Sequence, residues 1–158
     1  DYPNSGIYAE KVLMNPKADD NVKSDAQIII ARAAIETGDE AKAKVAYAKV
    51  LAIAKGELAA EALYYDAYFK NKEGKFEASN AAVQKIAKNY SSYKYFGAKG
   101  LILMAKNFYG LKDSYQATYI LENVIQNFTD YPDVVSEAKT ELNAIKTEEA
   151  KTNSSITK

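Results

Sequence analysis

The sequence of 158 residues contains no histidine and no cysteine. The chain therefore has no Ser-His-Asp relay, no thiolate nucleophile, no disulfide framework and no zinc bound by imidazole or thiolate. These absences exclude most of the catalytic constellations that proteins use. We expect a protein that is not an enzyme and that has no cofactor and no metal site.

Arginine is nearly absent as well, since Arg32 is the only one in the chain. Lys and Arg together number 21 and are balanced by 21 Asp and Glu, so bulk charge gives no attraction to nucleic acid or to anionic lipid. Guanidinium groups supply most bidentate contacts to bases and phosphates. Apolar runs such as residues 28–31 and 101–105 are far shorter than the roughly 20 residues that cross a bilayer. We expect neither nucleic-acid binding nor direct membrane insertion.

Proline occurs only at positions 3, 16 and 132, which leaves a long alanine-rich interval without a strong helix breaker. From residue 28 to residue 35 apolar side chains recur at steps of three and four, as on one face of a helix. Ser24 or Asp25 is the expected N-cap, Gly38 suits a left-handed C-cap, and Asp39 can cap the following helix. The interval is therefore predicted to be all-α and to open with a helical hairpin.

The hairpin pattern recurs twice more along the chain. Small residues at 43, 79 and 117 and apolar residues at 50, 86 and 124 repeat with steps of 36 and then 38. A helix pair repeated at about this period is typical of a stacked α-solenoid, in which each hairpin buries its apolar faces against its neighbours. The sequence thus predicts three stacked hairpins.

The third copy is the most complete, with Leu101, Met104-Ala105, Phe108, Lys112-Asp113, Ala117, Leu121 and Val124. On these residues the chain resembles the tetratricopeptide repeat family. The first copy departs from the family pattern at Gln27 and Ala34, and the first helix of the second copy fits only with one extra residue before Gly74. The resemblance implies a right-handed α-solenoid of about three such hairpins followed by a C-terminal capping helix.

We divide the chain accordingly. Residues 1–23 are predicted to be the end of a preceding repeat, with a short helix over 7–14 and a polar loop over 15–23. The three repeats are 24–57, 58–95 and 96–130, and the second has an extended loop over 89–95. Residues 131–150 are predicted to form the capping helix, with an apolar stripe of Val135, Ala138, Leu142 and Ile145, and residues 151–158 a disordered tail. The chain is expected to be the C-terminal part of a longer array.

The resemblance also implies a function, namely a scaffold that binds a peptide or protein segment in the groove lined by the first helices. The residues that the resemblance places on this groove are Arg32, Glu36, Tyr64, Tyr68, Asn71, Lys99, Lys106 and Tyr109. The Lys-rich, Tyr-bearing repeats are similar to those of large arrays in Bacteroidetes-type bacteria, which implies a periplasmic or cell-envelope location, with the cytoplasm as the alternative.

Two other functions stay open. Thirteen tyrosines against five phenylalanines allow a module that stacks tyrosine rings on a glycan or another small ligand. A hydrolase that uses carboxylates alone would need two acids facing each other across a closed pocket. Tyr47, Tyr65 and Tyr119 are expected in the core, and Asp66 is the one acid for which we expect burial.

Overall fold

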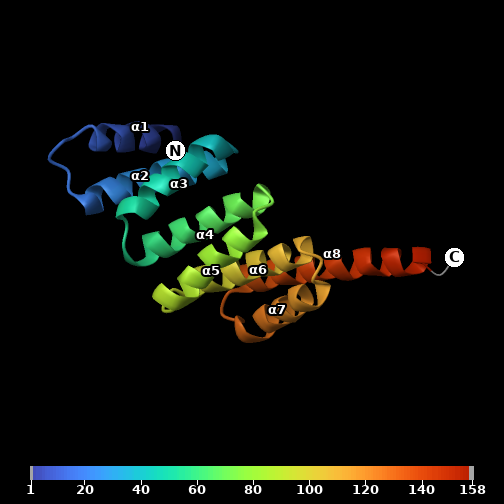
Figure 1. Ribbon diagram of the computed structural model, residues 1–158. Coiled ribbons are helices and arrows are strands. Elements are labelled where there is room, and N and C mark those ends of the chain that lie inside the picture. Colours follow the sequence, from blue (N-terminus) through green and yellow to red (C-terminus); the bar gives the residue numbers. More distant parts are fainter. Residues whose placement is uncertain (1, 157–158) are drawn as a thin grey trace.

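The computed structural model describes residues 2–156, with side chains over residues 4–154, and these residues form helices and turns with no strand. In chain order the helices are α1 (Tyr2–Leu13), α2 (Asp20–Glu36), α3 (Glu40–Ile53), α4 (Gly56–Lys72), α5 (Phe76–Asn89), α6 (Lys94–Gly110), α7 (Ser114–Asn127) and α8 (Pro132–Ile156). Figure 1 shows that they follow one another across the molecule from α1 to α8. The all-α prediction is confirmed over this part of the chain.

The three predicted hairpins have the same dimensions. Their first helices, α2, α4 and α6, each have 17 residues, and their second helices, α3, α5 and α7, each have 14. The first helices begin at residues 20, 56 and 94, and the second helices at 40, 76 and 114. Both series therefore repeat the steps of 36 and 38 residues seen in the sequence.

The turn inside each hairpin is closed in the same way. The N–H of Asp39 donates to the carbonyl of Ala34, that of Lys75 to Lys70, and that of Asp113 to Phe108, the long bond of a Schellman motif. The residue before each donor has a left-handed φ, of 74° at Gly38 and 68° at Lys112. The side chains of Asp39 and Asp113 then cap α3 and α7, as predicted for Asp39.

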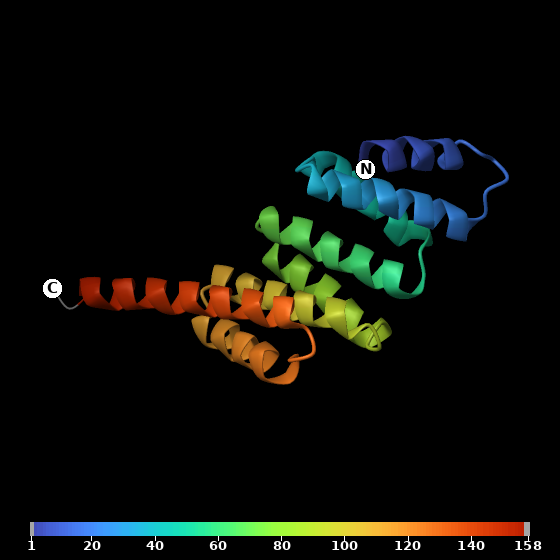
Figure 2. The same cartoon turned by 180° about the vertical axis from the view of Figure 1, so that it is seen from behind.

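Packing is local along the chain. Each helix packs on the next one, from α1 on α2 to α7 on α8, and in addition α4 packs on α6 and α6 on α8. The buried apolar residues form three clusters, one under α1 to α4, one under α4, α5 and α6, and one under α6, α7 and α8. Figure 2 shows the same succession from behind. This is the arrangement of a helical repeat, in which neighbouring hairpins share a core.

The repeated small and apolar residues lie where the sequence pattern places them. Ala43, Ser79 and Ala117 are fully buried at the crossings within the hairpins. Val50, Ile86 and Val124, one repeat apart, are buried as well. Helix axes about 8–10 Å apart leave room for little more than a methyl or hydroxymethyl group at the crossing. The register inferred from the sequence is therefore confirmed at these positions.

Enlarging a residue at a crossing should destabilise the stack. Ala105 and Ala117 are fully buried in the core of α6, α7 and α8. We expect Ala105→Leu or Ala117→Leu to lower the free energy of unfolding by about 1–3 kcal/mol through overpacking. Thermal and urea melts measure the effect, with Ala144→Leu on the exposed side of α8 as the matched control. Melts of both core variants that coincide with that of the parent would contradict this packing.

The N-terminal boundaries differ from the prediction. α2 begins at Asp20, and its N-cap is Asp19, whose carboxylate accepts from the N–H of Val22. The prediction that Ser24 or Asp25 caps this helix is therefore wrong, because Asp19 offers an equally good capping side chain five residues before Ser24. α1 also extends back to Tyr2 rather than beginning at residue 7.

The connections between hairpins are shorter than predicted. The extended loop expected over 89–95 is a four-residue turn over 90–93, because Asn89 still belongs to α5 and Lys94 and Tyr95 already belong to α6. A turn of the same length, 128–131, joins α7 to α8, whereas only residues 54–55 join α3 to α4. At that shorter connection the first helices α2 and α4 lack the close packing seen between α4 and α6.

The capping helix is longer than predicted. α8 continues through residues 151–156, which were expected to belong to a disordered tail, and residues 157–158 lie outside the described part of the chain. No proline or glycine follows Pro132, so nothing in the sequence stops the helix. Its buried stripe contains Val134 rather than Val135, together with the predicted Ala138, Leu142 and Ile145. None of the helices described here is both long and apolar enough to cross a bilayer.

Candidate functional site

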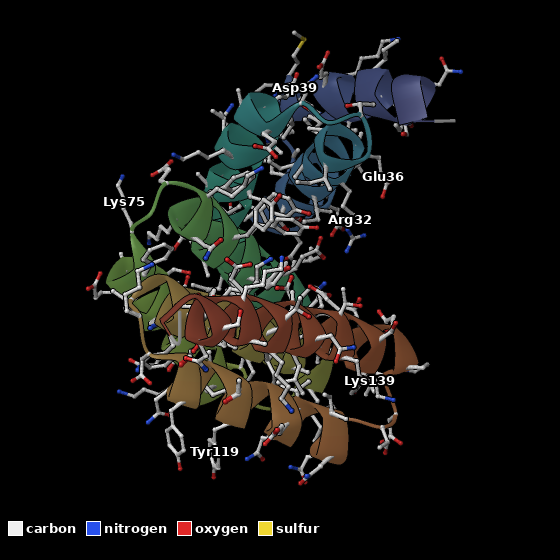
Figure 3. The ribbon with its side chains drawn as sticks, turned by 90° about the vertical axis from the view of Figure 1, so that its right-hand side faces the viewer. Arg32, Glu36, Asp39, Lys75, Tyr119 and Lys139 are labelled. Carbon is white, nitrogen blue, oxygen red and sulfur yellow. The ribbon has the colours of Figure 1, made fainter. Side chains whose placement is uncertain are left out.

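The eight predicted groove residues lie on the first helices of the three hairpins. Arg32 and Glu36 belong to α2, Tyr64, Tyr68 and Asn71 to α4, and Lys99, Lys106 and Tyr109 to α6. We call the surface that they mark the first-helix face. In Figure 3 Arg32 and Glu36 project to the same side of α2, as residues four apart on a helix do.

Several of these side chains contact a neighbouring first helix or the capping helix α8. The amide nitrogen of Asn71 donates to Oδ1 of Asn107 on α6 at 2.7 Å. Lys99 forms an ion pair with Glu137 on α8, and its ammonium lies 5.5 Å from the centre of the Tyr64 ring on α4. Lys106 pairs with Glu141 on α8 at 3.1 Å. Side-chain contacts therefore connect the first-helix face from one hairpin to the next.

The accessibility of the eight residues is uneven. Arg32 and Glu36 are exposed, whereas Tyr68, Asn71, Lys99, Lys106 and Tyr109 are half-buried. Tyr64 is buried, with 8% of its surface exposed. The structure thus does not gather the eight residues at one point, and only Arg32 and Glu36 line the same pocket.

That pocket, which we call the Arg32 pocket, lies where α2 and α4 separate. Its volume is about 270 Å³. Four aromatic side chains line it, namely Tyr47 from α3, Tyr65 from α4, and Tyr95 and Phe96 from α6. Its charged lining residues are Arg32, Glu36 and Glu61. Residues from four helices, α2, α3, α4 and α6, therefore line one opening.

Glu61 is the charged centre of the pocket. Its side chain is only 5% exposed, and its two carboxylate oxygens accept from Nε of Arg32 at 2.9 Å and from Nη2 at 2.5 Å. The hydroxyl of buried Tyr47 donates to the same carboxylate at 2.9 Å. A bidentate guanidinium and a phenol together satisfy a buried acid that would otherwise be costly. The hydrogen bonds to Glu61 raise the pKa of Arg32.

The sequence analysis missed Glu61 and expected Asp66 to be the buried acid. Asp66 is half-buried and pairs with Lys70 one turn later on α4. The signal for Glu61 was present, since it is the one charged residue in a run of alanine and leucine, residues 59–63, whose members are all buried. It lies on the buried face of α4, and its burial depends on partners that are distant in sequence.

The core tyrosines were predicted with mixed success. Tyr47 is buried, and its ring stacks on half-buried Tyr65 with centroids 4.0 Å apart. Tyr119 is 55% exposed, so its predicted core position is wrong. It lies two residues before fully buried Leu121, where the helical period turns the side chain away from α6 and α8.

Alkaline titration should report the buried phenols. Burial raises the pKa values of Tyr47 and Tyr64, and burial together with the hydrogen bond to Asp133 raises the pKa of Tyr95 to about 12. A raised folded-state pKa means that stability is complete below the ordinary value of 10.0 and declines as the pH rises toward 12. Tyrosinate absorbance followed together with circular dichroism measures this.

We expect Tyr95→Phe to reduce the alkaline loss of stability and Tyr119→Phe, at an exposed position, to leave it unchanged. Complete ionisation of the tyrosines near pH 10.0 with a fully native dichroism spectrum would contradict the burial described for these rings.

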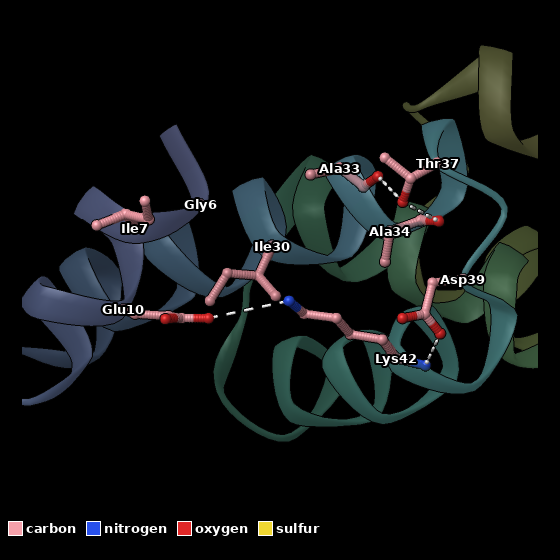
Figure 4. A pocket seen from close by; sticks show the side chains of 9 residues that line it. All are labelled: Gly6, Ile7, Glu10, Ile30, Ala33, Ala34, Thr37, Asp39 and Lys42. Atoms are coloured by element: carbon pink, nitrogen blue, oxygen red, sulfur yellow. Dashed lines mark hydrogen bonds and ion pairs between the residues drawn. The ribbon is translucent and has the colours of Figure 1, made fainter. Parts of the chain in front are cut away.

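Of the other hollows in the described part of the chain, two include residues of a first helix. One, of about 300 Å³, lies between α1, α2 and α3, and Figure 4 shows Glu10 and Lys42 facing each other across it at 3.9 Å. The other, of about 400 Å³, lies between the ends of α5 and α7 over Gly97 and Leu101 of α6. Neither contains any of the eight predicted residues.

The described residues contain no group of three or more His, Cys, Asp or Glu side chains placed to hold a metal ion. No known protein-family model matches the chain, and no curated protein is significantly similar to it. The account of its function therefore rests on the residues and contacts of this chain.

Proposed function

We propose that this chain is a non-catalytic scaffold that binds an extended peptide or protein segment along the first-helix face. The observation that carries the proposal is the succession of three first helices of equal length, repeated at 36 and 38 residues, in which α4 packs on α6 and the Arg32–Glu61 pair joins α2 to α4. In a stack of this kind the first helices form one continuous surface. We propose further that the stack is a right-handed, tetratricopeptide-like solenoid.

The side chains of this surface support binding rather than chemistry. Half-buried Tyr68 and Tyr109 offer rings held in place by packing, which give contact area at a low cost in entropy. Glu61 is the one buried acid among the side chains that the structure describes, and both of its oxygens are occupied by Arg32 and Tyr47. An acid engaged in this way is poorly placed to exchange a proton with a substrate.

The glycan-binding alternative draws less support. It needs tyrosine rings that are open to a sugar face, whereas Tyr64 is buried and carries the ammonium of Lys99 over its ring. Isothermal titration with a panel of oligosaccharides tests this alternative. Saturable sugar binding that is lost in Tyr64→Ala would favour it over the scaffold.

The scaffold itself is tested by selecting peptides from a random display library against the intact chain. Affinities of the selected peptides are then measured on Tyr68→Ala and Tyr109→Ala. Tyr115→Ala and Tyr119→Ala, at exposed positions on α7, are matched controls. We expect the first pair to weaken binding roughly tenfold, the effect of losing one anchoring contact, and the controls to bind like the parent. Weakening by the α7 variants alone would contradict the proposal.

A further inference from the structure

The Arg32 pocket differs from the rest of the first-helix face in being hollow. The first helices α4 and α6 are in contact, but α2 and α4 lack such close packing, and the side chains of Arg32 and Glu61 bridge them. A volume of about 270 Å³ falls just below the roughly 300–1,000 Å³ of pockets that hold a whole small molecule. It suits a single side chain of a longer ligand.

The walls of the pocket are aromatic. Tyr47 and Tyr65 are stacked, and Tyr95 meets Phe96 edge to face with centroids 5.3 Å apart. Aromatic rings attract a cation placed near their faces. The same chain uses this contact twice within its own fold, with Lys99 near Tyr64 and Lys72 near Tyr68, each ammonium 5.5 Å from a ring centre.

The charged side chains of the pocket also favour a cationic ligand. Arg32 is the only cation that lines the pocket, and Glu61 holds it in a bidentate pair. Glu36 also lines the pocket, and neither a hydrogen bond nor an ion pair joins its carboxylate to another described side chain. Glu57, in the first turn of α4, is close enough to act on the charge of Arg32. Two carboxylates, Glu36 and Glu61, therefore line the pocket together with one guanidinium, and Glu57 lies nearby.

The side of the pocket formed by α6 has further carboxylates nearby. Tyr95 donates a hydrogen bond to Asp133 at 2.8 Å, and Glu137 also acts on the Tyr95 phenol. Lys99, which is paired with Glu137, supplies positive charge on this side. The charged lining of the pocket itself thus consists of two carboxylates and one guanidinium, in a chain whose net charge is zero. An incoming cation meets a favourable local potential.

We propose that the Arg32 pocket receives a lysine or arginine side chain of the bound segment, so that the partner is basic at the point where it passes between α2 and α4. This inference rests on the proposed function. The aliphatic stem of such a side chain would lie against the aromatic walls, and its charged end would face Glu36, which lines the pocket, with Glu57 near Arg32.

The test uses the intact chain and three fluorescein-labelled peptides that alternate alanine with lysine, norleucine or glutamate. Norleucine keeps the aliphatic stem of lysine and removes its charge. Fluorescence anisotropy should show binding of the lysine peptide and little binding of the other two. The double variant Glu36→Gln, Glu57→Gln should bind the lysine peptide several-fold more weakly. Glu77→Gln, in the first turn of α5, is the matched control and should bind it like the parent.

A second variant separates the aromatic contribution from charge. Phe96→Leu keeps an apolar wall and removes a ring, and we expect a roughly two- to fivefold loss of affinity for the lysine peptide. Circular dichroism melts establish that each variant is folded, and tetramethylammonium chloride, added as a competitor, probes for a free organic cation.

Several results would overturn the inference. They are equal or tighter binding of the norleucine or glutamate peptide, unchanged binding of the lysine peptide by the double variant, no binding of the lysine peptide, and binding of tetramethylammonium without binding of the lysine peptide. Each leaves the scaffold proposal to be decided by the display selection, because a non-basic peptide recovered there and lost in Tyr109→Ala would uphold the scaffold while the inference about the pocket failed.

Discussion

Leu121→Ala should lower the free energy of unfolding by about 2–5 kcal/mol. Leu121 is fully buried in the middle of α7, within the core that α6, α7 and α8 share. Removing three carbons there loses transfer free energy and leaves a cavity between three helices that cannot all move inward. Urea unfolding followed by circular dichroism measures the change.

The control for this variant lies two residues away. Tyr119→Ala removes a larger side chain from an exposed position on the same helix, and we expect a change within about 0.5 kcal/mol. The pair therefore tests which face of α7 is buried. Equal losses in the two variants, or a larger loss in Tyr119→Ala, would contradict the placement of this helix.

Asn107→Asp should destabilise the protein by about 3–5 kcal/mol at neutral pH, the cost of an uncompensated buried charge. Asn107 is fully buried on α6, and its amide nitrogen donates to Oγ of Ser79 and Oδ1 of Asn80, each at 2.8 Å. Its carbonyl oxygen accepts from Asn71. An aspartate of the same shape loses both donated bonds and turns a negative oxygen toward two acceptors.

The pH dependence identifies the cause of this loss. Burial raises the pKa of a carboxyl above its ordinary value of about 3.9, so the folded state favours the neutral acid. The deficit relative to the parent should therefore shrink as the pH falls and grow as it rises. Asn143→Asp on the exposed side of α8 is the matched control and should show no comparable deficit. A deficit in Asn107→Asp that is the same at acid and neutral pH would point to lost packing instead of buried charge.

The hairpins could be predicted because their signals are local. Gly38 and Gly74 permit the left-handed turn, Asp39 and Asp113 cap the next helix, and the small residues at the crossings repeat at a fixed period. Lys112 shows the limit of this reasoning, since it adopts a left-handed φ without being glycine. The turn before α7 was predicted from the repeat period and from the capping residue Asp113 instead.

The contents of the site could be predicted only in part. Arg32 and Glu36 follow from their place on a first helix, but the burial of Glu61 depends on a guanidinium 29 residues earlier and on the separation of α2 from α4. Asn107 is a polar residue in the sequence and a fully buried one in the fold, because its partners come from α4 and α5. Contacts of this kind appear only when the hairpins are stacked.

The most direct test of the account is a map of backbone amide chemical shifts as the intact chain is titrated with a peptide from the display selection. The account predicts that the perturbed amides cluster on α2, α4 and α6, with those around Arg32, Tyr68 and Tyr109 among the most affected. Perturbations that cluster on α5 and α7 and leave the first helices unchanged would show that the partner lies elsewhere.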